Sequence, residues 1–213
     1  MNHRYWPLRG LRIRTPRLEL RLPDEVLLDE LASVGAGGVH APDTMPFTVP
    51  WTDGEPDEVG RATYQHVLST IAGWTAQDWH LSLAVLHEGE VVGRQDVMGR
   101  EFGVRREVVT GSWLGLAHQG RGIGTEMRAA ALHLAFEGLG ARYAVSEART
   151  DNGGSLGVSR RLGYEPDGFQ VQVIRGAATT LQRLRLDRAG WEKHRGIDVT
   201  VEGLDACRAD FGV

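Results

Sequence analysis

The chain has 213 residues, of which 41% are hydrophobic and 24% charged, values typical of a globular domain with a sizeable core. Its formal net charge of −4 provides no general attraction to nucleic acid or to an anionic membrane. No apolar run approaches the ~18 residues of a membrane span, and residues 1–11 lack the hydrophobic region of a signal peptide. The single cysteine, Cys207, excludes an internal disulfide. We expect a cytoplasmic protein with no nucleic-acid or membrane partner.

The first part of the chain predicts a strand, two helices and a long loop between them. Residues 17–22 alternate polar and apolar side chains, as a half-buried strand does. A helix opens at residues 23–25 and ends at the glycines of residues 35–38. Residues 40–56 hold four prolines and three large apolar side chains, so this loop either covers the core or contacts the substrate. A second helix is expected over residues 57–76.

The rest of the chain predicts alternating strands and helices around a glycine-rich turn. Strands are expected over residues 81–87, 91–99, 108–116, 143–148, 171–175, 181–186 and 197–201, and helices over 126–138 and 152–162. The early meander favours antiparallel pairing, and the strand–helix–strand unit favours one parallel pair. The fold class is therefore α/β with a mixed, mainly antiparallel central sheet.

We expect a single domain over residues 1–213. Its core spans about residues 12–190, and residues 191–213 form a C-terminal extension. The strand at 197–201 is a candidate for contact in a homodimer.

Three glycines, Gly120, Gly122 and Gly124, occupy the turn between the strand at 108–116 and the following helix. Their bare backbone N–H groups and the positive end of the helix form a site for a phosphate or pyrophosphate. The lysine-bearing phosphate loop is absent, because Lys193 is the only lysine of the chain. The third glycine also comes one residue too early for the dinucleotide fingerprint. The histidines show no metal-ligand spacing, so no metal is expected. Another phosphorylated nucleotide remains an alternative ligand.

Two blocks of the sequence resemble the GCN5-related N-acetyltransferases (GNAT). Gln119, Gly122 and Gly124 match the family's acyl-CoA motif, and Asn152–Tyr164 is similar to its second conserved segment. Both occur in the right order within the matching sequence of elements, and the likeness covers about residues 12–190.

Further runs narrow the resemblance. Thr15–Leu18 and the loop before the second helix resemble the branch of the ribosomal-protein N-acetyltransferases. Met45–Phe47, Gly111–Leu116 and Gly124–Ala130 resemble an actinobacterial subgroup with one mycobacterial member associated with succinyl-CoA.

The resemblance implies a coenzyme A site between two splayed parallel strands, with helices on both faces of the sheet. The pantetheine arm would pair with Leu114 and Leu116 as a peptide does, and Gly115 would ease a bulge. The Asn152 amide would reach the arm, and Ser155 would bond near the arm or the thioester. Without the resemblance, Asn152 is a helix cap. The pyrophosphate would be bound by N–H groups of Gln119, Gly120, Arg121, Gly122, Ile123, Gly124 and Thr125.

The implied reaction is transfer of an acetyl group from acetyl-CoA to a primary amine by direct attack. An N–H such as that of Leu114 would stabilise the oxyanion. Relatives carry a glutamate base where this chain has Val109, so Glu107, on the same face of the strand, is the candidate base. Glu101, Asp96 and a water chain are its rivals. Ser159 stands where relatives carry a tyrosine acid, and Ser155 is the second catalytic candidate.

The sequence leaves the donor, the acceptor and catalysis itself open. Succinyl-CoA is an alternative donor, whose carboxylate would need partners such as Arg94, Gln95, Arg100 or the loop at 40–56. The departures at Val109 and Ser159 also allow a non-catalytic acyl-CoA sensor. The acceptor is a small-molecule amine or a protein amine.

Overall fold

A nine-stranded sheet forms the centre of the computed structural model, which describes residues 3–213. The strand order is β7-β8-β6-β5-β4-β3-β2-β1-β9. All neighbouring strands are antiparallel except β5 and β6. This confirms the mixed, mainly antiparallel sheet with one parallel pair. The strands are β1 (Arg12–Arg14), β2 (Leu18–Arg21), β3 (Asp78–His87), β4 (Glu90–Arg100), β5 (Glu107–Leu114), β6 (Tyr143–Arg149), β7 (Glu165–Ile174), β8 (Ala177–Asp187) and β9 (Thr200–Glu202).

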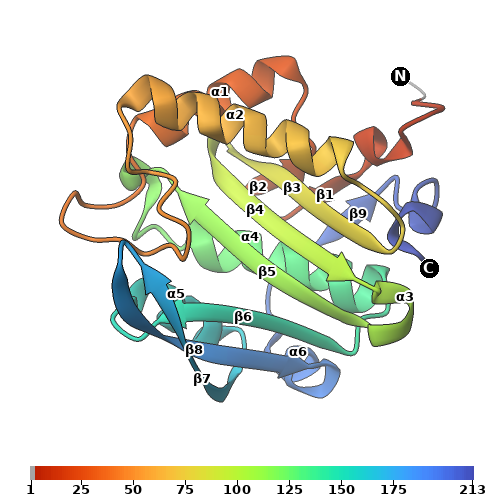
Figure 1. Ribbon diagram of the computed structural model, residues 1–213. Coiled ribbons are helices and arrows are strands. Elements are labelled where there is room, and N and C mark those ends of the chain that lie inside the picture. The colour runs from red at the N-terminus through yellow and green to blue at the C-terminus, as the bar shows by residue number, and fades with distance from the viewer. Residues whose placement is uncertain (1–2) are drawn as a thin grey trace.

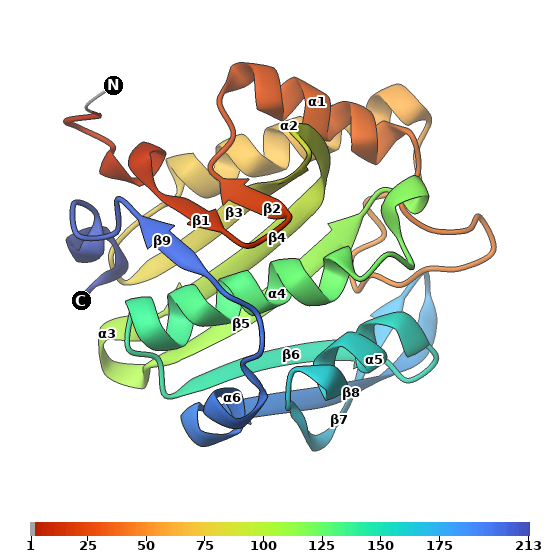
Figure 2. The ribbon, with the colours of Figure 1, turned by 180° about the vertical axis from the view of Figure 1, so that it is seen from behind.

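Helices cover both faces of the sheet, as expected. On one face α1 (Glu25–Ala36) and α2 (Pro56–Ala72) pack against β3 and β4 (Figure 1). On the other lie α4 (Ile123–His133), α5 (Gly153–Arg161) and α6 (Arg188–His194) (Figure 2). A short helix, α3 (Phe102–Arg105), joins β4 to β5. We call the two sides the α1–α2 face and the α4 face.

Strand β3 has apolar side chains on both faces because both are covered. Leu81 and Leu83 belong to the main core under α4, whereas Ala84 and Leu86 pack against α1 and α2. The near-continuous apolar run of this strand is the pattern expected of a strand buried on two sides. The sheet therefore separates two hydrophobic clusters, and a single strand such as β3 contributes side chains to both.

The C-terminal segment belongs to the core. Phe211 is fully buried, and its carbonyl accepts a hydrogen bond of 3.2 Å from Trp79 Nε1. Strand β9 lies close to the expected range of 197–201 and pairs with β1 of its own chain. Residues 191–213 thus complete the domain, because they close one edge of its sheet and fill its interior.

Several boundaries differ from the sequence prediction. Helix α4 begins at Ile123 because Gly122, with a φ of 79°, already ends the turn as its N-cap. Strand β5 ends at Leu114, so Gly115 lies beyond the strand and forms no bulge. The bulges occur instead in β4, where Val92 is the extra residue opposite β3, and in β7. Strands β7 and β8 are longer than predicted because they form one extended hairpin. Strand β1 and helices α3 and α6 were not predicted.

Gly99 is a test of core packing. A Cβ at this position would lie 2.3 Å from Cζ2 of Trp79, which is only 1% exposed and has no room to move. We expect Gly99→Ala to lower the free energy of unfolding by roughly 1–3 kcal/mol in urea denaturation. Gly10→Ala is the matched control, since a Cβ there meets nothing within 4 Å. Equal stability of both variants would contradict this packing.

Candidate active site

The parallel pair of strands separates after three residue pairs. Glu107, Val108 and Val109 pair with the first residues of β6, and beyond Val109 no further pair forms. Strand β6 instead follows β8 along its whole length, while β5 follows β4 as far as Leu114. A gap therefore opens between β5 and β6, as the family resemblance implied.

Backbone groups of β5 face this gap. The Gly115 N–H donates to Val92 O (3.0 Å), so Leu114 and its partner Gly93 form a non-hydrogen-bonded pair. The N–H groups of Leu114 and of Ser112, two residues earlier, therefore point away from β4 and into the gap. They are in position to pair with the amides of an extended arm or to stabilise an oxyanion.

The glycine turn presents free donors at the end of the gap. Gly120 and Gly122 both have positive φ angles, of 72° and 79°. Within residues 3–213, the N–H groups of residues 120–124 have no acceptor. They lie in the turn and at the start of α4, where the helix dipole favours an anion. This arrangement fits a pyrophosphate.

Three of the expected cofactor donors have other partners. The Leu116 N–H donates to Gly38 O, the Gln119 N–H to Leu116 O and the Thr125 N–H to Gly122 O. The Gln119 side chain instead donates to Val39 O (2.8 Å) and Leu114 O (2.9 Å). Its role in this structure is to hold the end of β5 against the loop that follows α1.

An ion pair that the sequence analysis did not assign to the site supports the turn. Glu126, in the first turn of α4, is buried and accepts from Thr15 Oγ1 (2.6 Å), from Arg17 N (3.1 Å) and from Arg17 Nε (2.7 Å). Burial opposes ionisation of Glu126, but these bonds outweigh it and lower its pKa. Arg17 Nη1 also donates to Arg121 O (3.2 Å). The only sequence signal was the Thr15–Leu18 run.

Helix α5 supplies the other side of the gap. Asn152 is its N-cap, because Oδ1 accepts from the Ser155 N–H (3.0 Å). The cap leaves the Asn152 side-chain N–H₂ free of partners within residues 3–213, so capping and binding of the arm are compatible. The Ser155 hydroxyl also makes no hydrogen bond in the described chain.

The expected base lies away from the gap. Glu107 opens β5, four residues before Gly111 and thus ~13 Å along the strand. Its two oxygens bind Arg105 (2.6 Å) and Arg185 (2.9 Å). A carboxylate held by two guanidinium groups at the paired end of the strand is badly placed to take a proton from an amine.

Two other carboxylates lie nearer, on the α1–α2 face. Asp96 is opposite Gly111 in the ladder, and its Oδ2 lies 4.0 Å from where a Gly111 Cβ would stand. Burial opposes ionisation of Asp96, but Arg94, His80 and Ser82 lower its pKa to about 2. Such a carboxylate is charged at neutral pH and is a weak base.

Glu147 is the second carboxylate. It is two residues beyond Val145, the partner of Val109, and so lies on the same face directly after the strands separate. The Glu147 side chain is exposed, but partial desolvation raises its pKa, and Gln170 Nε2 donates to one of its oxygens. Its position in mid-strand gave no sequence signal, because the pairing of β6 was needed to show which way it points.

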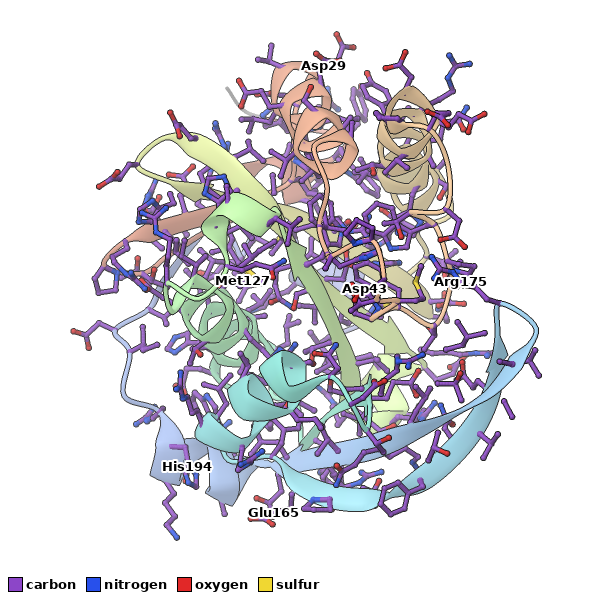
Figure 3. All side chains as sticks on the ribbon, turned by 90° about the vertical axis from the view of Figure 1, so that its left-hand side faces the viewer. Asp29, Asp43, Met127, Glu165, Arg175 and His194 are labelled. Atoms are coloured by element: carbon purple, nitrogen blue, oxygen red, sulfur yellow. The ribbon has the colours of Figure 1, made fainter. Side chains whose placement is uncertain are left out.

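The loop at 40–56 covers the α1–α2 face beside the gap. Met45 packs against Ile174 and Leu181 of the β7–β8 hairpin, and Asp53 forms an ion pair with Arg175 at its tip. Figure 3 shows the labelled Arg175 beside the loop that carries Asp43. Trp51 packs on Trp113, so the loop's aromatic side chains both cover the core and line this approach.

The residues suggested for a succinyl carboxylate do not converge. Arg94 already binds Asp96 (3.1 Å), and Gln95 points into the opposite face, where it bonds Gly111 O. Arg100 is at the far end of β4.

Within residues 3–213 no group of His, Cys, Asp or Glu is arranged to hold a metal, and no helix is long and apolar enough to cross a membrane.

Comparison with known families agrees with this geometry. Residues 17–165, most of the chain, match the model of the acetyltransferase (GNAT) domain. The chain belongs to the GNAT acetyltransferase family. This GNAT protein is accordingly an acetyl-CoA-dependent N-acetyltransferase. The gap between β5 and β6 and the glycine turn both lie within the residues that match the family model, and both present backbone N–H groups without a partner.

Solved structures share the fold. The ribosomal L7/L12 α-N-protein acetyltransferase RimL in complex with coenzyme A is 22% identical, with a TM-score of 0.65 over 81% of this chain and 95% of that one. RimJ of Mycobacterium smegmatis with a CoA disulfide is 16% identical, with a TM-score of 0.69 over 95% of each chain. A GCN5-related N-acetyltransferase of Brucella melitensis is 20% identical, with a TM-score of 0.68 over 86% and 81%.

Arg17 offers a test of the anion site. Its removal leaves the Glu126 carboxylate uncompensated beside the turn, and this charge would repel a pyrophosphate. We expect Arg17→Gln to weaken CoA binding about tenfold in calorimetry, equivalent to about 1.4 kcal/mol. The double variant Arg17→Gln/Glu126→Gln should regain most of the loss, and Arg208→Gln serves as an exposed control. Unchanged affinity in the single variant would contradict this role.

Proposed function

We propose that this acetyltransferase modifies the N-terminal α-amine of a protein. The observation that carries the proposal is the bridge between the loop at 40–56 and the β7–β8 hairpin, made by Met45, Ile174, Leu181 and the Asp53–Arg175 pair. It narrows the approach to the gap on the α1–α2 face, and a narrow approach favours a chain end over the middle of a folded chain.

The electrostatics of this face support an amine acceptor. Asp96 is charged at neutral pH, and Glu147 lies on the other side of the gap. Because Asp96 is paired with Arg94 (3.1 Å), the attraction for an ammonium group comes mainly from Glu147. The names of similar structures point the same way, since RimL is described as an α-N-protein acetyltransferase.

We propose Glu147 as the base in place of Glu107. A general base works best when its pKa is near the operating pH, and partial desolvation moves the pKa of Glu147 upward in that direction. Asp96, with a pKa of about 2, keeps its charge as the buried partner of Arg94 and is therefore not the base. The amine attacks the acetyl carbonyl carbon, the C–S bond breaks, and Glu147 receives the amine proton. The N–H groups of Ser112 and Leu114 face the position of the oxyanion, and Asn152 and Ser155 bind the arm.

The acceptor class is tested with two peptides of one sequence that contains lysine. The first has a free N-terminus, and the second is N-acetylated. At neutral pH the α-amine, with a pKa of about 7.7–8.0, is far less protonated than lysine at about 10.4. We expect thiol release from acetyl-CoA with the first peptide only, and peptide mass spectrometry should place the acetyl group at the N-terminus. Faster acetylation of the blocked peptide would overturn the proposal.

The base is tested by the pH dependence of kcat. Glu147 acts only when ionised, so activity should rise with pH through its raised pKa, above the ordinary value of 4.5. Glu147→Gln should lower kcat about a hundredfold and abolish this rise of kcat with pH, which is the acid limb of the pH profile. Glu165→Gln, an exposed position at the start of β7, is the control. If the limb survives in Glu147→Gln and disappears in Glu107→Gln, the base is Glu107.

A further inference from the structure

One buried cation of the α4 face has no counter-ion. Arg128 of α4 is 5% exposed, and it forms no ion pair within residues 3–213. Its Nε is buried without a hydrogen-bond partner. Burial lowers the pKa of Arg128, as expected for a guanidinium without a carboxylate beside it. Because an unpaired buried charge is costly, this arrangement is typical of a site that meets an anion during function.

The position of Arg128 relative to the gap follows from its helix. Gly124, in the first turn of α4, faces Leu114 at the end of β5 and Val158 of α5. Arg128, one turn later on the same side of the helix, contacts Ser112 of β5 and Ser159 of α5. Helix α4 therefore runs back along β5, and Arg128 lies one turn deeper than the glycine turn. It forms the floor of the gap between β5 and α5.

Two hydroxyl groups accept hydrogen bonds from this guanidinium, but their own protons differ in availability. Arg128 Nη1 donates to Ser159 Oγ (2.9 Å), and Ser159 in turn donates to Ser155 O (3.0 Å). Arg128 Nη2 donates to Ser112 Oγ (3.2 Å). The Ser112 proton has no acceptor within the described chain. Ser112 is thus a hydroxyl polarised by a cation, on the strand whose N–H groups face the gap.

We propose that Ser112, polarised by Arg128, donates a hydrogen bond to the sulfur of coenzyme A and stabilises the thiolate that leaves. This inference rests on the binding of the pantetheine arm along β5. When the amine nitrogen forms its bond to the carbonyl carbon, the C–S bond breaks and its electron pair stays on sulfur. The amine proton goes to the base, and the thiolate keeps its charge against the Ser112 hydroxyl. Ser112 touches the reacting sulfur, while Arg128 is a positioning residue that acts through it and is anchored by Ser159.

This arrangement accounts for the absence of an acid on α5. The residue at the expected place of a tyrosine is Ser159, whose proton is committed to Ser155 O. A thiolate held by a charge-assisted hydrogen bond can depart without receiving a proton. In this proposal the leaving thiolate needs no proton from a side chain.

The proposal is tested on bound coenzyme A alone, without an acceptor. The ultraviolet absorbance of the thiolate, titrated against pH with saturating protein, gives the pKa of the bound thiol. We expect this pKa to lie about one unit below that of free coenzyme A, ordinarily near 8.5 for a thiol. Ser112→Ala and Arg128→Gln should return it to the free value, and Arg128→Lys should retain part of the shift. A bound thiol with the free value in the unmodified protein overturns the proposal.

Kinetics with acetyl-CoA provide the second readout. Ser112→Ala should lower kcat about tenfold, with little change in KM for acetyl-CoA, because the hydrogen bond strengthens only as charge develops on sulfur. Ser33→Ala and Arg142→Gln, both at exposed positions, are the matched controls. Because Arg128 is buried, its variants are first compared by circular dichroism and melting temperature. If Arg128→Gln does not fold, the thiol pKa and the kcat of Ser112→Ala decide whether the proposal holds.

The outcomes separate this inference from the proposed acceptor. The thiol titration needs no amine, so a lowered pKa in the unmodified protein that is lost in Ser112→Ala supports the inference even if no peptide is acetylated. A normal thiol pKa beside active acetylation of N-termini overturns the inference and leaves the acceptor proposal standing. No rise in melting temperature with coenzyme A would overturn both.

Discussion

The site depends on one constraint, that β5 and β6 cannot stay paired to their ends. Each strand has an antiparallel partner on its outer side, β4 for β5 and β8 for β6, and follows that partner instead. Backbone N–H groups that lose their strand partner need another, because an unpaired polar group away from water is costly. Those of Ser112 and Leu114 are therefore open to a ligand with peptide-like amides. The gap is consequently a candidate binding site that results from sheet topology rather than from any single side chain.

Charge is then distributed to match the two ends of the ligand. At the outer end the turn from Gly120 to Gly124 offers N–H groups, and Arg17 neutralises the Glu126 carboxylate buried beneath it. At the inner end Arg128 places positive charge under the strand, on the side where the sulfur would lie. In our proposal the amine approaches from the opposite face, where Glu147 lies and where Asp96 is paired with Arg94. The sheet thus separates the unpaired cation Arg128 from the carboxylate proposed as the base, and each lies on the side where the opposite charge would develop.

Our proposals assign the roles of the two expected catalytic positions to other residues. Val109 replaces the expected glutamate, yet Glu147 reaches the same face from the neighbouring strand. Ser159 replaces the expected tyrosine, yet it anchors Arg128 and thereby acts on Ser112. In both proposals the role is taken by a residue of an adjacent element, and β5 and α4 contribute to one hydrophobic core.

The sequence by itself determined the family, the fold class and the anion turn, because glycine spacing, strand periodicity and the Asn152 block are local signals. It also placed most elements, although α4 begins at Ile123 and the hairpin of β7 and β8 is longer than its apolar runs indicate. Only the tertiary structure decided what surrounds the reacting atoms. Glu126 contacts Arg17, and Arg128 contacts Ser112, although these residues are separated in the chain. The face on which Glu147 lies follows from the pairing of β6 with β5. Their roles depend on strand order and register, which no local pattern carries.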